Sequence, residues 1–169
     1  SEFFSYTPQE RNEELIETFR VISEQIGHVF ERKLSRKKFE FMALHDPLTN
    51  IPNRKLFEIL AHQSFAASRR TLQKTAILMF DIDFFKNVND NFGHEIGDSL
   101  LIMASERIRN SIRESDTLSR LGGDEFGILL HEIDGSNHIK SVAKKILKEL
   151  LKPFPIMANS LTIHVSASI

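Results

Sequence analysis

Two short apolar runs in residues 118–130 are separated by four residues without apolar side chains: Gly122, Gly123, Asp124 and Glu125. Strand-length runs joined by paired glycines are typical of a β-hairpin whose tip uses positive φ angles. Such hairpins are common surface turns, and alone they carry no functional information. Glycines also bare the backbone to a bulky anion, and carboxylates beside them suit a metal ion. The sequence therefore predicts a tight, exposed hairpin that is either an ordinary turn or a ligand site.

A second constrained stretch lies upstream, where residues 76–80 form a continuous apolar run. The run predicts a strand buried on both faces. It ends abruptly at Asp81, Ile82 and Asp83. Carboxylates at the end of a buried strand are costly unless something pairs with them, and Mg²⁺ bridged to substrate phosphates is a suitable partner. This stretch therefore predicts metal-dependent phosphoryl or nucleotidyl chemistry.

The first quarter of the chain has helical character and no proline between Pro8 and Pro47. Its apolar residues recur at helical spacing, and the line shifts once, as in a stutter. They are Phe19, Ile22, Ile26, Val29, Phe30, Leu34, Phe41 and Leu44. A helix with so narrow a stripe cannot bury itself alone, so we expect it to pair with a second copy of the chain. The alternative is packing on its own domain or on a neighbour outside the given sequence.

Length and composition limit the remaining classes. The 169 residues suit one domain plus an extension, and the net charge of −1 gives no basic surplus for nucleic acid or an anionic membrane. Cysteine is absent, which excludes disulfides and thiolate metal sites. No apolar run approaches the roughly 18 residues of a membrane span, and no signal peptide is recognisable. We expect a cytoplasmic chain without a membrane segment.

The remaining patterns predict an alternation of helices and strands. Helices are expected at residues 54–70, 99–113 and 138–151, strands at 75–81 and 161–169, a polar loop at 84–97 and a turn at 134–137. In the first of these helices, the residues expected to face inward are Leu56, Ile59, Leu60 and Phe65.

Three separated motifs carry a family resemblance: HDPLTNIPNR at residues 45–54, FDIDFFKNVNDNFGHEIGD at 80–98 and GGDEF at 122–126. Together they resemble the GGDEF family of diguanylate cyclases, from residue 45 to the end of the chain. The resemblance implies an α+β fold of the palm-like nucleotidyl cyclase type, in which helices flank a central, mostly antiparallel sheet. The long N-terminal helix precedes this fold in the sequence. The expected divisions are a tag or disordered segment at 1–7, a signalling helix at 8–45 and a GGDEF domain at 46–169. We expect that domain to be incomplete at its C-terminal end, without the family's late segment and its basic residues for the triphosphate.

The resemblance also implies an activity and its partners. Two GTP molecules condense to cyclic di-GMP and two pyrophosphates across a homodimer of half-sites. The long helix resembles the end of a GAF sensor domain, which implies an upstream sensor.

The implied metal is Mg²⁺, with Mn²⁺ as a substitute. Its ligands would be Asp81, the Ile82 carbonyl and Asp124, and Glu125 would be either a further ligand or the general base. Gly122 and Gly123 would admit the nucleotide to the backbone, whereas Asp83 would be structural.

The family reads guanine with residues that correspond to Asn89 and Asp98, and His94 would lie beside the substrate. Carboxylate and amide groups suit the polar edge of guanine. The backbone of Phe84 and Phe85 and the side chain of Lys86 would meet the phosphates. Without the resemblance, Asn89 reads as a loop residue, Asp98 as a helix N-cap, His94 as structural and Lys86 as a solvated cation.

Arg113 and Asp116 lie in the register of the family's RxxD product-inhibition site. There the arginine would bind phosphate and guanine, and the aspartate would pair with the guanine edge. The alternative is an i, i+3 surface ion pair at a helix end. For the whole chain, the alternative function is a non-catalytic signalling module that binds GTP or cyclic di-GMP, or one that only mediates interactions.

Overall fold

The computed structural model describes residues 13–156 and 161–169. The chain forms two compact units, one ending at Phe41 and one at Met42–Ile169. Within the described ranges, no helix combines the length and apolar character needed to cross a bilayer.

The first unit contains most of the helix α1, Glu13–Leu44. Its 32 residues confirm the expected long helix, although the predicted start at residues 8–12 lies outside the described residues. The middle of the apolar stripe is exposed: Val29 is 64% and Leu34 66% accessible. These two side chains therefore have most of their surface available for packing.

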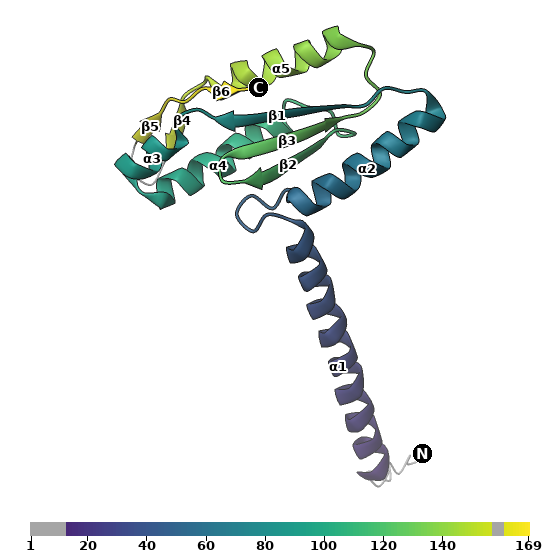
Figure 1. Cartoon of the computed structure of the whole chain (residues 1–169). Helices are drawn as coiled ribbons and strands as arrows, with labels where there is room; N and C mark the ends of the chain where they lie inside the picture. The colour runs from purple at the N-terminus through teal and green to yellow at the C-terminus, as the bar shows by residue number, and fades with distance from the viewer. Residues whose placement is uncertain (1–12, 157–160) are drawn as a thin grey trace, which may run out of the picture. The chain divides into compact units, whose positions relative to one another are not determined.

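The second unit is built on a four-stranded sheet (Figure 1). The strand order is β2 (Thr117–Gly122), β3 (Glu125–Leu130), β1 (Ala76–Ile82), β6 (Ala167–Ser168), and every neighbouring pair is antiparallel. This arrangement confirms the α+β class with an antiparallel sheet.

Helices cover the two faces of the sheet unequally. One face packs on α4 (His94–Arg109) and α5 (Ser136–Leu150), and its buried core includes Phe80, Leu100, Phe126 and Ile146. The rings of Phe80 and Phe126 stack with centroids 5.5 Å apart. On the other face α2 (Arg54–Thr71) packs mainly against β2 and β3.

The predicted burial of β1 on both faces is wrong. Leu78, Phe80 and Ile82 are buried, whereas Ile77 and Met79 are 36% and 56% exposed. The cause is the position of α2, which covers the neighbouring strands and leaves this side of β1 open. Apolar side chains favour burial, but an apolar run does not establish that other elements pack on both faces of its strand.

Helix α2 begins at the predicted residue and ends one residue later than predicted, but its inward face differs. Phe57 and Ala61 are buried and Leu56 and Leu60 are half-buried, while Ile59 and Phe65 are exposed. The side chain of Asn53 caps the helix by accepting a hydrogen bond from the Leu56 amide at 3.1 Å. The buried side chains pack under α2 against Leu121 and Leu129.

The polar loop expected at residues 84–97 is also wrong. It contains α3 (Phe85–Phe92) and the first turn of α4, separated by Gly93 at φ 86°. Val88 and Ile96 are buried in the main core, so tertiary packing stabilises two helices in a stretch of weak helical pattern. The next helix accordingly ends at Arg109 rather than at Arg113.

The single strand expected at residues 161–169 is two separate strands. β5 (Leu161–Ile163) pairs with β4 (Phe154–Ile156) in a small second sheet, and β6 pairs with β1. β4 was not predicted because prolines at 153 and 155 indicated only the end of a helix. Pro155 is compatible with an edge strand, where its missing N–H costs no ladder bond.

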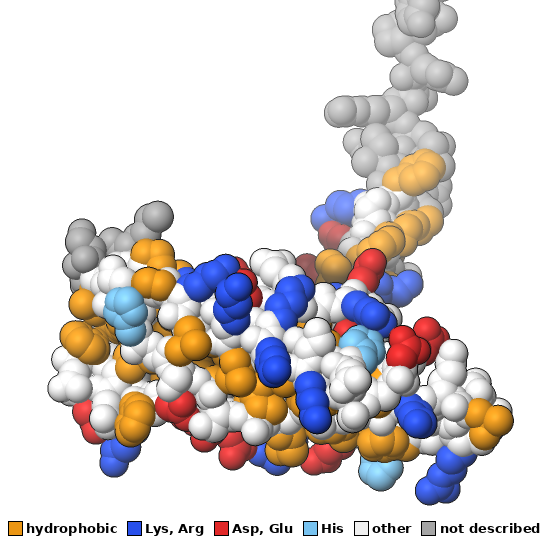
Figure 2. All heavy atoms as spheres, turned by 90° about the horizontal axis from the view of Figure 1, so that it is seen from above, with side chains coloured by type: hydrophobic (Ala, Val, Ile, Leu, Met, Phe, Trp, Pro, Cys, Tyr) orange, Lys and Arg blue, Asp and Glu red, His pale blue; other side chains and the backbone are white. Residues whose placement is uncertain are grey.

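Helix α5 is amphipathic, with its apolar side in the core and lysines outside. Figure 2 looks down on this part of the molecule and shows basic side chains gathered across the middle of the visible face. The exposed lysines of α5 and its end are Lys140, Lys144, Lys145, Lys148 and Lys152.

Candidate active site

The tip of the β2–β3 hairpin has the geometry that its glycines predict. Gly122 pairs with Glu125, so that Gly123 and Asp124 alone form the loop. Gly122 and Gly123 have φ angles of 150° and 52°, and nothing lies within 4 Å of where a Cβ on either would stand. Gly123 therefore supplies a left-handed conformation, and the space beside both residues is open to a ligand.

The sheet brings two of the predicted carboxylates together. Asp81 on β1 is the direct register partner of Glu125 on β3, and on its other side it pairs with Ser168 on β6. These three residues line one hollow of about 330 Å³. Asp124 is half-buried at the tip, one residue before β3, and the Ile82 side chain is buried in the core.

The donor set at this end of the sheet fits Mg²⁺. Among the described residues, no three His, Asp or Glu side chains gather as a closed metal site would require. Mg²⁺ needs only one or two carboxylates, because waters and substrate phosphates complete its octahedral shell. Asp81 and Asp124, with Glu125 adjacent, supply hard oxygen donors of this type beside an open hollow.

An uncapped helix terminus follows β1 after Asp83 and Phe84. Phe84 adopts a left-handed conformation with φ 59°, and α3 begins at Phe85 without a side-chain cap. First-turn amides of an uncapped helix are available donors for phosphate, and the helix dipole favours negative charge there. Lys86 is exposed on this first turn, so a phosphate here would meet both amides and an ammonium.

The predicted base-reading residues lie on the α3–α4 pair. Asn89 is half-buried on α3, and its Oδ1 has no hydrogen-bond partner among the described residues. Asp98 is exposed in the second turn of α4, so the alternative of an N-cap aspartate is wrong. His94 is the exposed first residue of α4. The two helices pack together, which places all three residues on one supersecondary unit.

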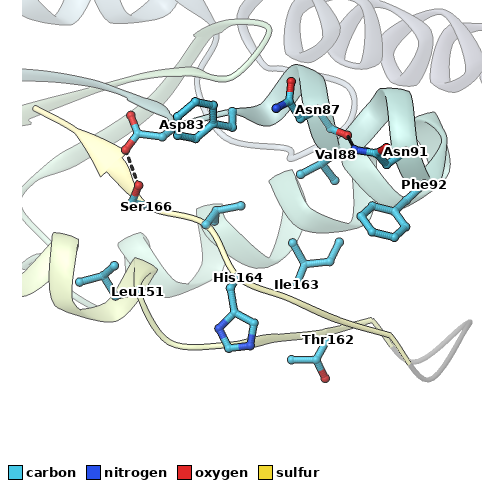
Figure 3. A pocket seen from close by; sticks show the side chains of 12 residues that line it. Asp83, Asn87, Val88, Asn91, Phe92, Leu151, Thr162, Ile163, His164 and Ser166 are labelled. Carbon is cyan, nitrogen blue, oxygen red and sulfur yellow. Dashed lines mark hydrogen bonds between the residues drawn. The ribbon is translucent and has the colours of Figure 1, made fainter.

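Asp83 forms hydrogen bonds with Ser166 and Ser168. Its carboxylate accepts hydrogen bonds from the hydroxyls of Ser166 and Ser168, the latter at 2.7 Å, and these bonds lower its pKa. Its amide donates to the Ser166 carbonyl at 2.9 Å. Figure 3 shows Asp83 turned toward Ser166 at one edge of a hollow of about 580 Å³ between α3 and residues 162–166. These contacts are those of a structural residue.

Arg113 and Asp116 occupy the turn between α4 and β2, at the opposite end of β2 from the hairpin tip. Asp116 is only 4% exposed, and its two carboxylate oxygens accept from the amides of Arg113 at 3.1 Å and His131 at 3.2 Å. Arg113 is exposed. The alternative of a surface ion pair is therefore wrong, because Asp116 is buried and bound to backbone amides.

Two arginines that the sequence did not single out contact the hairpin. Arg54 forms an ion pair with Glu125 at 3.1 Å and donates to the Leu121 carbonyl at 2.9 Å. Arg120 donates to the Gly123 carbonyl at 2.8 Å and pairs with Asp46 at 3.0 Å. Arg54 is the last residue of the motif at residues 45–54, and Arg120 lies two residues before the GGDEF motif. The position of Arg120 close to two carboxylates was the signal in the sequence that could have indicated its role.

Comparison with known proteins agrees with this geometry. The sequence profile described as "Diguanylate cyclase, GGDEF domain" matches residues 43–169. The chain is 42% identical over 128 residues to MucR of Pseudomonas aeruginosa, a bifunctional diguanylate cyclase/cyclic di-GMP phosphodiesterase, covering 76% of this chain and 18% of MucR. It is 36% identical to the diguanylate cyclase TpbB of the same organism, covering 73% of this chain and 30% of TpbB. The chain thus spans less than a third of these two relatives.

Solved structures place the fold in the same group. The GGDEF domain of TpbB superposes with a TM-score of 0.70 at 35% identity, covering 73% of this chain and 71% of that one. The coiled coil and GGDEF domain of DgcB from Caulobacter crescentus, solved with c-di-GMP, superposes with a TM-score of 0.79 over 89% of this chain and 80% of that one. At 20% identity this second match concerns the fold alone.

Proposed function

Because the chain belongs to the GGDEF family of diguanylate cyclases, we propose that it joins two molecules of GTP into cyclic di-GMP and releases two pyrophosphates. The observation that carries the proposal is the pairing of Asp81 on β1 with Glu125 on β3. Asp124 directly precedes Glu125, and the uncapped helix α3 begins four residues after Asp81. The chain therefore supplies carboxylates for a metal and backbone amides for phosphates within a few residues of this pair.

In this proposal the residues divide the work by chemistry. Asp81, Asp124 and the Ile82 carbonyl would hold Mg²⁺ or Mn²⁺, which would supply charge neutralisation for the triphosphate and Lewis-acid activation of the 3′-hydroxyl. Glu125 is either a further ligand or the base that receives the hydroxyl proton. The amides at Phe84 and Phe85, with Lys86, orient the phosphates, while the 3′-oxygen bonds to the α-phosphorus as pyrophosphate leaves.

Guanine recognition falls to the α3–α4 pair. Asp98 accepts from the N1–H and 2-amino groups, Asn89 meets the neighbouring edge, and His94 lies alongside. The half-buried position of Asn89 on α3, packed against α4 that carries Asp98 and His94, supports this role.

A homodimer is required because each domain carries half of the site. The exposed stripe of α1 supports pairing of two chains through that helix. An upstream sensor, with α1 as its last helix, would act on the cyclase by changing this pairing.

Product inhibition at Arg113 and Asp116 forms part of the proposal. The exposed guanidinium of Arg113 supplies the contact with phosphate and base. Asp116, whose carboxylate already binds two amides, shapes the turn that presents Arg113 and offers its remaining lone pairs to the guanine edge.

The decisive test is to incubate the chain with GTP and Mg²⁺ and to separate the nucleotides. We expect cyclic di-GMP from the unaltered chain and none from Asp124→Ala or Asp81→Ala. The matched control is Glu106→Gln, which removes an exposed carboxylate from α4. Turnover that survives Asp124→Ala would contradict the proposal. Binding of GTP or cyclic di-GMP without product would favour the non-catalytic module.

A further inference from the structure

Arg54 spans both strands of the catalytic hairpin. It is the first residue of α2, whose cap at Asn53 fixes the start of the helix. Its Nε donates to the Leu121 carbonyl on β2 at 2.9 Å, and its Nη2 donates to Glu125 Oε2 on β3 at 3.1 Å. Leu121 lies where the β2–β3 register is irregular, so this contact supports the hairpin where the ladder is interrupted.

Arg120, which is itself a residue of β2, bonds the tip through its side chain. Its side chain is only 13% exposed, with Nε donating to the Gly123 carbonyl at 2.8 Å and Nη1 to Asp46 Oδ1 at 3.0 Å. The same Asp46 oxygen accepts from the amide and the hydroxyl of Thr49 at 2.9 and 2.7 Å. Arg120 therefore ties the tip to a turn that is itself internally bonded.

We propose that Arg54 and Arg120 are positioning residues, an arginine bracket that holds the Leu121 and Gly123 carbonyls and thereby sets Asp124 and Glu125 against Asp81. The reaction that these carboxylates serve is the proposed cyclase activity, on which this inference rests. Neither arginine need touch substrate, because each acts through the backbone or side chain of the hairpin.

The tip needs such support for a physical reason. Gly122 and Gly123 have no side chains to pack, and both have positive φ, so the loop that carries Asp124 gains no rigidity from its own residues. An exposed ion pair such as Arg54–Glu125 contributes little to global stability. Its effect should instead appear in the orientation of the carboxylates, as for outer-shell partners of metal ligands.

The test uses Arg54→Gln, Arg54→Lys and Arg120→Gln in the full chain. Arg70→Gln is the matched control, because Arg70 is an exposed arginine at the other end of α2. Three quantities are measured: hydrogen exchange of amides 122–125, Mn²⁺ affinity by electron paramagnetic resonance with α,β-methylene-GTP present, and kcat and KM for GTP.

We expect Arg54→Gln and Arg120→Gln to speed exchange at the tip and to weaken Mn²⁺ binding by about 10- to 100-fold, with kcat falling more than KM changes. Exchange in the buried part of β3 should stay protected. Arg54→Lys should recover part of the loss, since it keeps the charge but cannot span two acceptors. Arg70→Gln should match the unaltered chain.

Unchanged tip exchange and Mn²⁺ affinity in Arg54→Gln would overturn the bracket, even if Arg120→Gln fails to fold. The exchange and Mn²⁺ measurements do not require turnover. If the unaltered chain makes no cyclic di-GMP, the cyclase proposal fails while these two measurements still decide the bracket. If it makes product and Arg54→Gln equals it in all three quantities, the bracket alone fails.

Discussion

The side-chain amide of Asn89 on α3 lies against the backbone of Gly97 on α4, in the space that a Cβ atom would fill at position 97. The ring of Phe85 closes the same space, 3.1 Å from that Cβ position. Gly97 is buried in the interior of α4, where alanine would ordinarily be the better helix former. The glycine is therefore explained by contact with Asn89 rather than by helix geometry.

We expect Gly97→Ala to displace the Asn89 amide and to impair guanine recognition. The KM for GTP should rise by about 5- to 100-fold, the range expected when one hydrogen-bonding base contact is lost. Discrimination between GTP and ATP should change in parallel. Steady-state kinetics with both nucleotides measures the effect.

The control is the double variant Asn89→Ala, Gly97→Ala, which removes the overlapping amide. If the glycine acts through Asn89, the KM for GTP of the double variant should be close to that of Asn89→Ala alone. Wild-type KM and selectivity in Gly97→Ala would contradict this role.

Substitutions of Asp116 and Arg113 should have different effects: the first should lower stability, and the second should relieve inhibition by the product. Asp116→Ala leaves the amides of Arg113 and His131 without their acceptor, and we expect a loss of about 2–4 kcal/mol in the free energy of unfolding. Arg113→Ala should change that free energy by less than about 0.5 kcal/mol, because its side chain is exposed. Urea unfolding followed by circular dichroism measures both.

The same Arg113→Ala variant should relieve product inhibition. Initial rates measured with added cyclic di-GMP should fall in the unaltered chain and stay constant in the variant. Equal inhibition of both proteins would remove Arg113 from the inhibitory site.

Asp46 should make the fold sensitive to acid. Burial raises the pKa of Asp46, but hydrogen bonds from Thr49 and Arg120 and the charge of Arg120 outweigh burial and lower it overall. In the unfolded chain an aspartate has a pKa of about 3.9. As the pH falls below this value, the unfolded chain binds the proton before the folded chain does. The free energy of unfolding therefore decreases until the pH falls below the lower pKa of the folded state. Asp46→Asn lacks this titration.

We therefore expect the stability difference between the unaltered chain and Asp46→Asn to shrink as pH falls from about 5 to 3. Urea unfolding at stepped pH values provides the measurement. A difference that stays constant over this interval would show that the Asp46 charge does not contribute.

The stripe of α1 should hold two chains together. Val29→Glu places a carboxylate among residues that are half to two-thirds exposed in a single chain, such as Ile26 at 52% and Phe30 at 63%. We expect the dimer dissociation constant to rise by at least about tenfold, since a buried unpaired charge costs well above 1.4 kcal/mol. Sedimentation equilibrium measures the change.

The matched control is His28→Glu, which adds the same carboxylate on the other side of α1. It should leave the dissociation constant within about threefold, because exposed surface substitutions change free energies little. Equal effects of the two variants would assign the change to charge rather than to the stripe.

Local patterns were sufficient for much of the fold. The Gly-Gly tip, the long proline-free helix and the bounds of α2 followed from rules that act over a few residues. The same rules failed at residues 84–97, where weak helical patterns form α3 and the start of α4 because Val88 and Ile96 are buried in the core. They also failed at the C-terminal strands, whose partners lie far away in sequence.

The candidate site divides in the same way. The sequence by itself determined which chemical groups are present: carboxylates at Asp81, Asp124 and Glu125, glycines at the hairpin tip, and a side-chain amide at Asn89. Only the tertiary structure decided which groups meet. Antiparallel register placed Asp81 opposite Glu125, packing of α3 on α4 placed Asn89 against Gly97, and the hairpin tip received contacts from Arg54 on α2 and from Arg120 on β2 itself. Residue types fix which interactions a side chain offers, whereas its partner is set by long-range pairing and burial that no local pattern encodes.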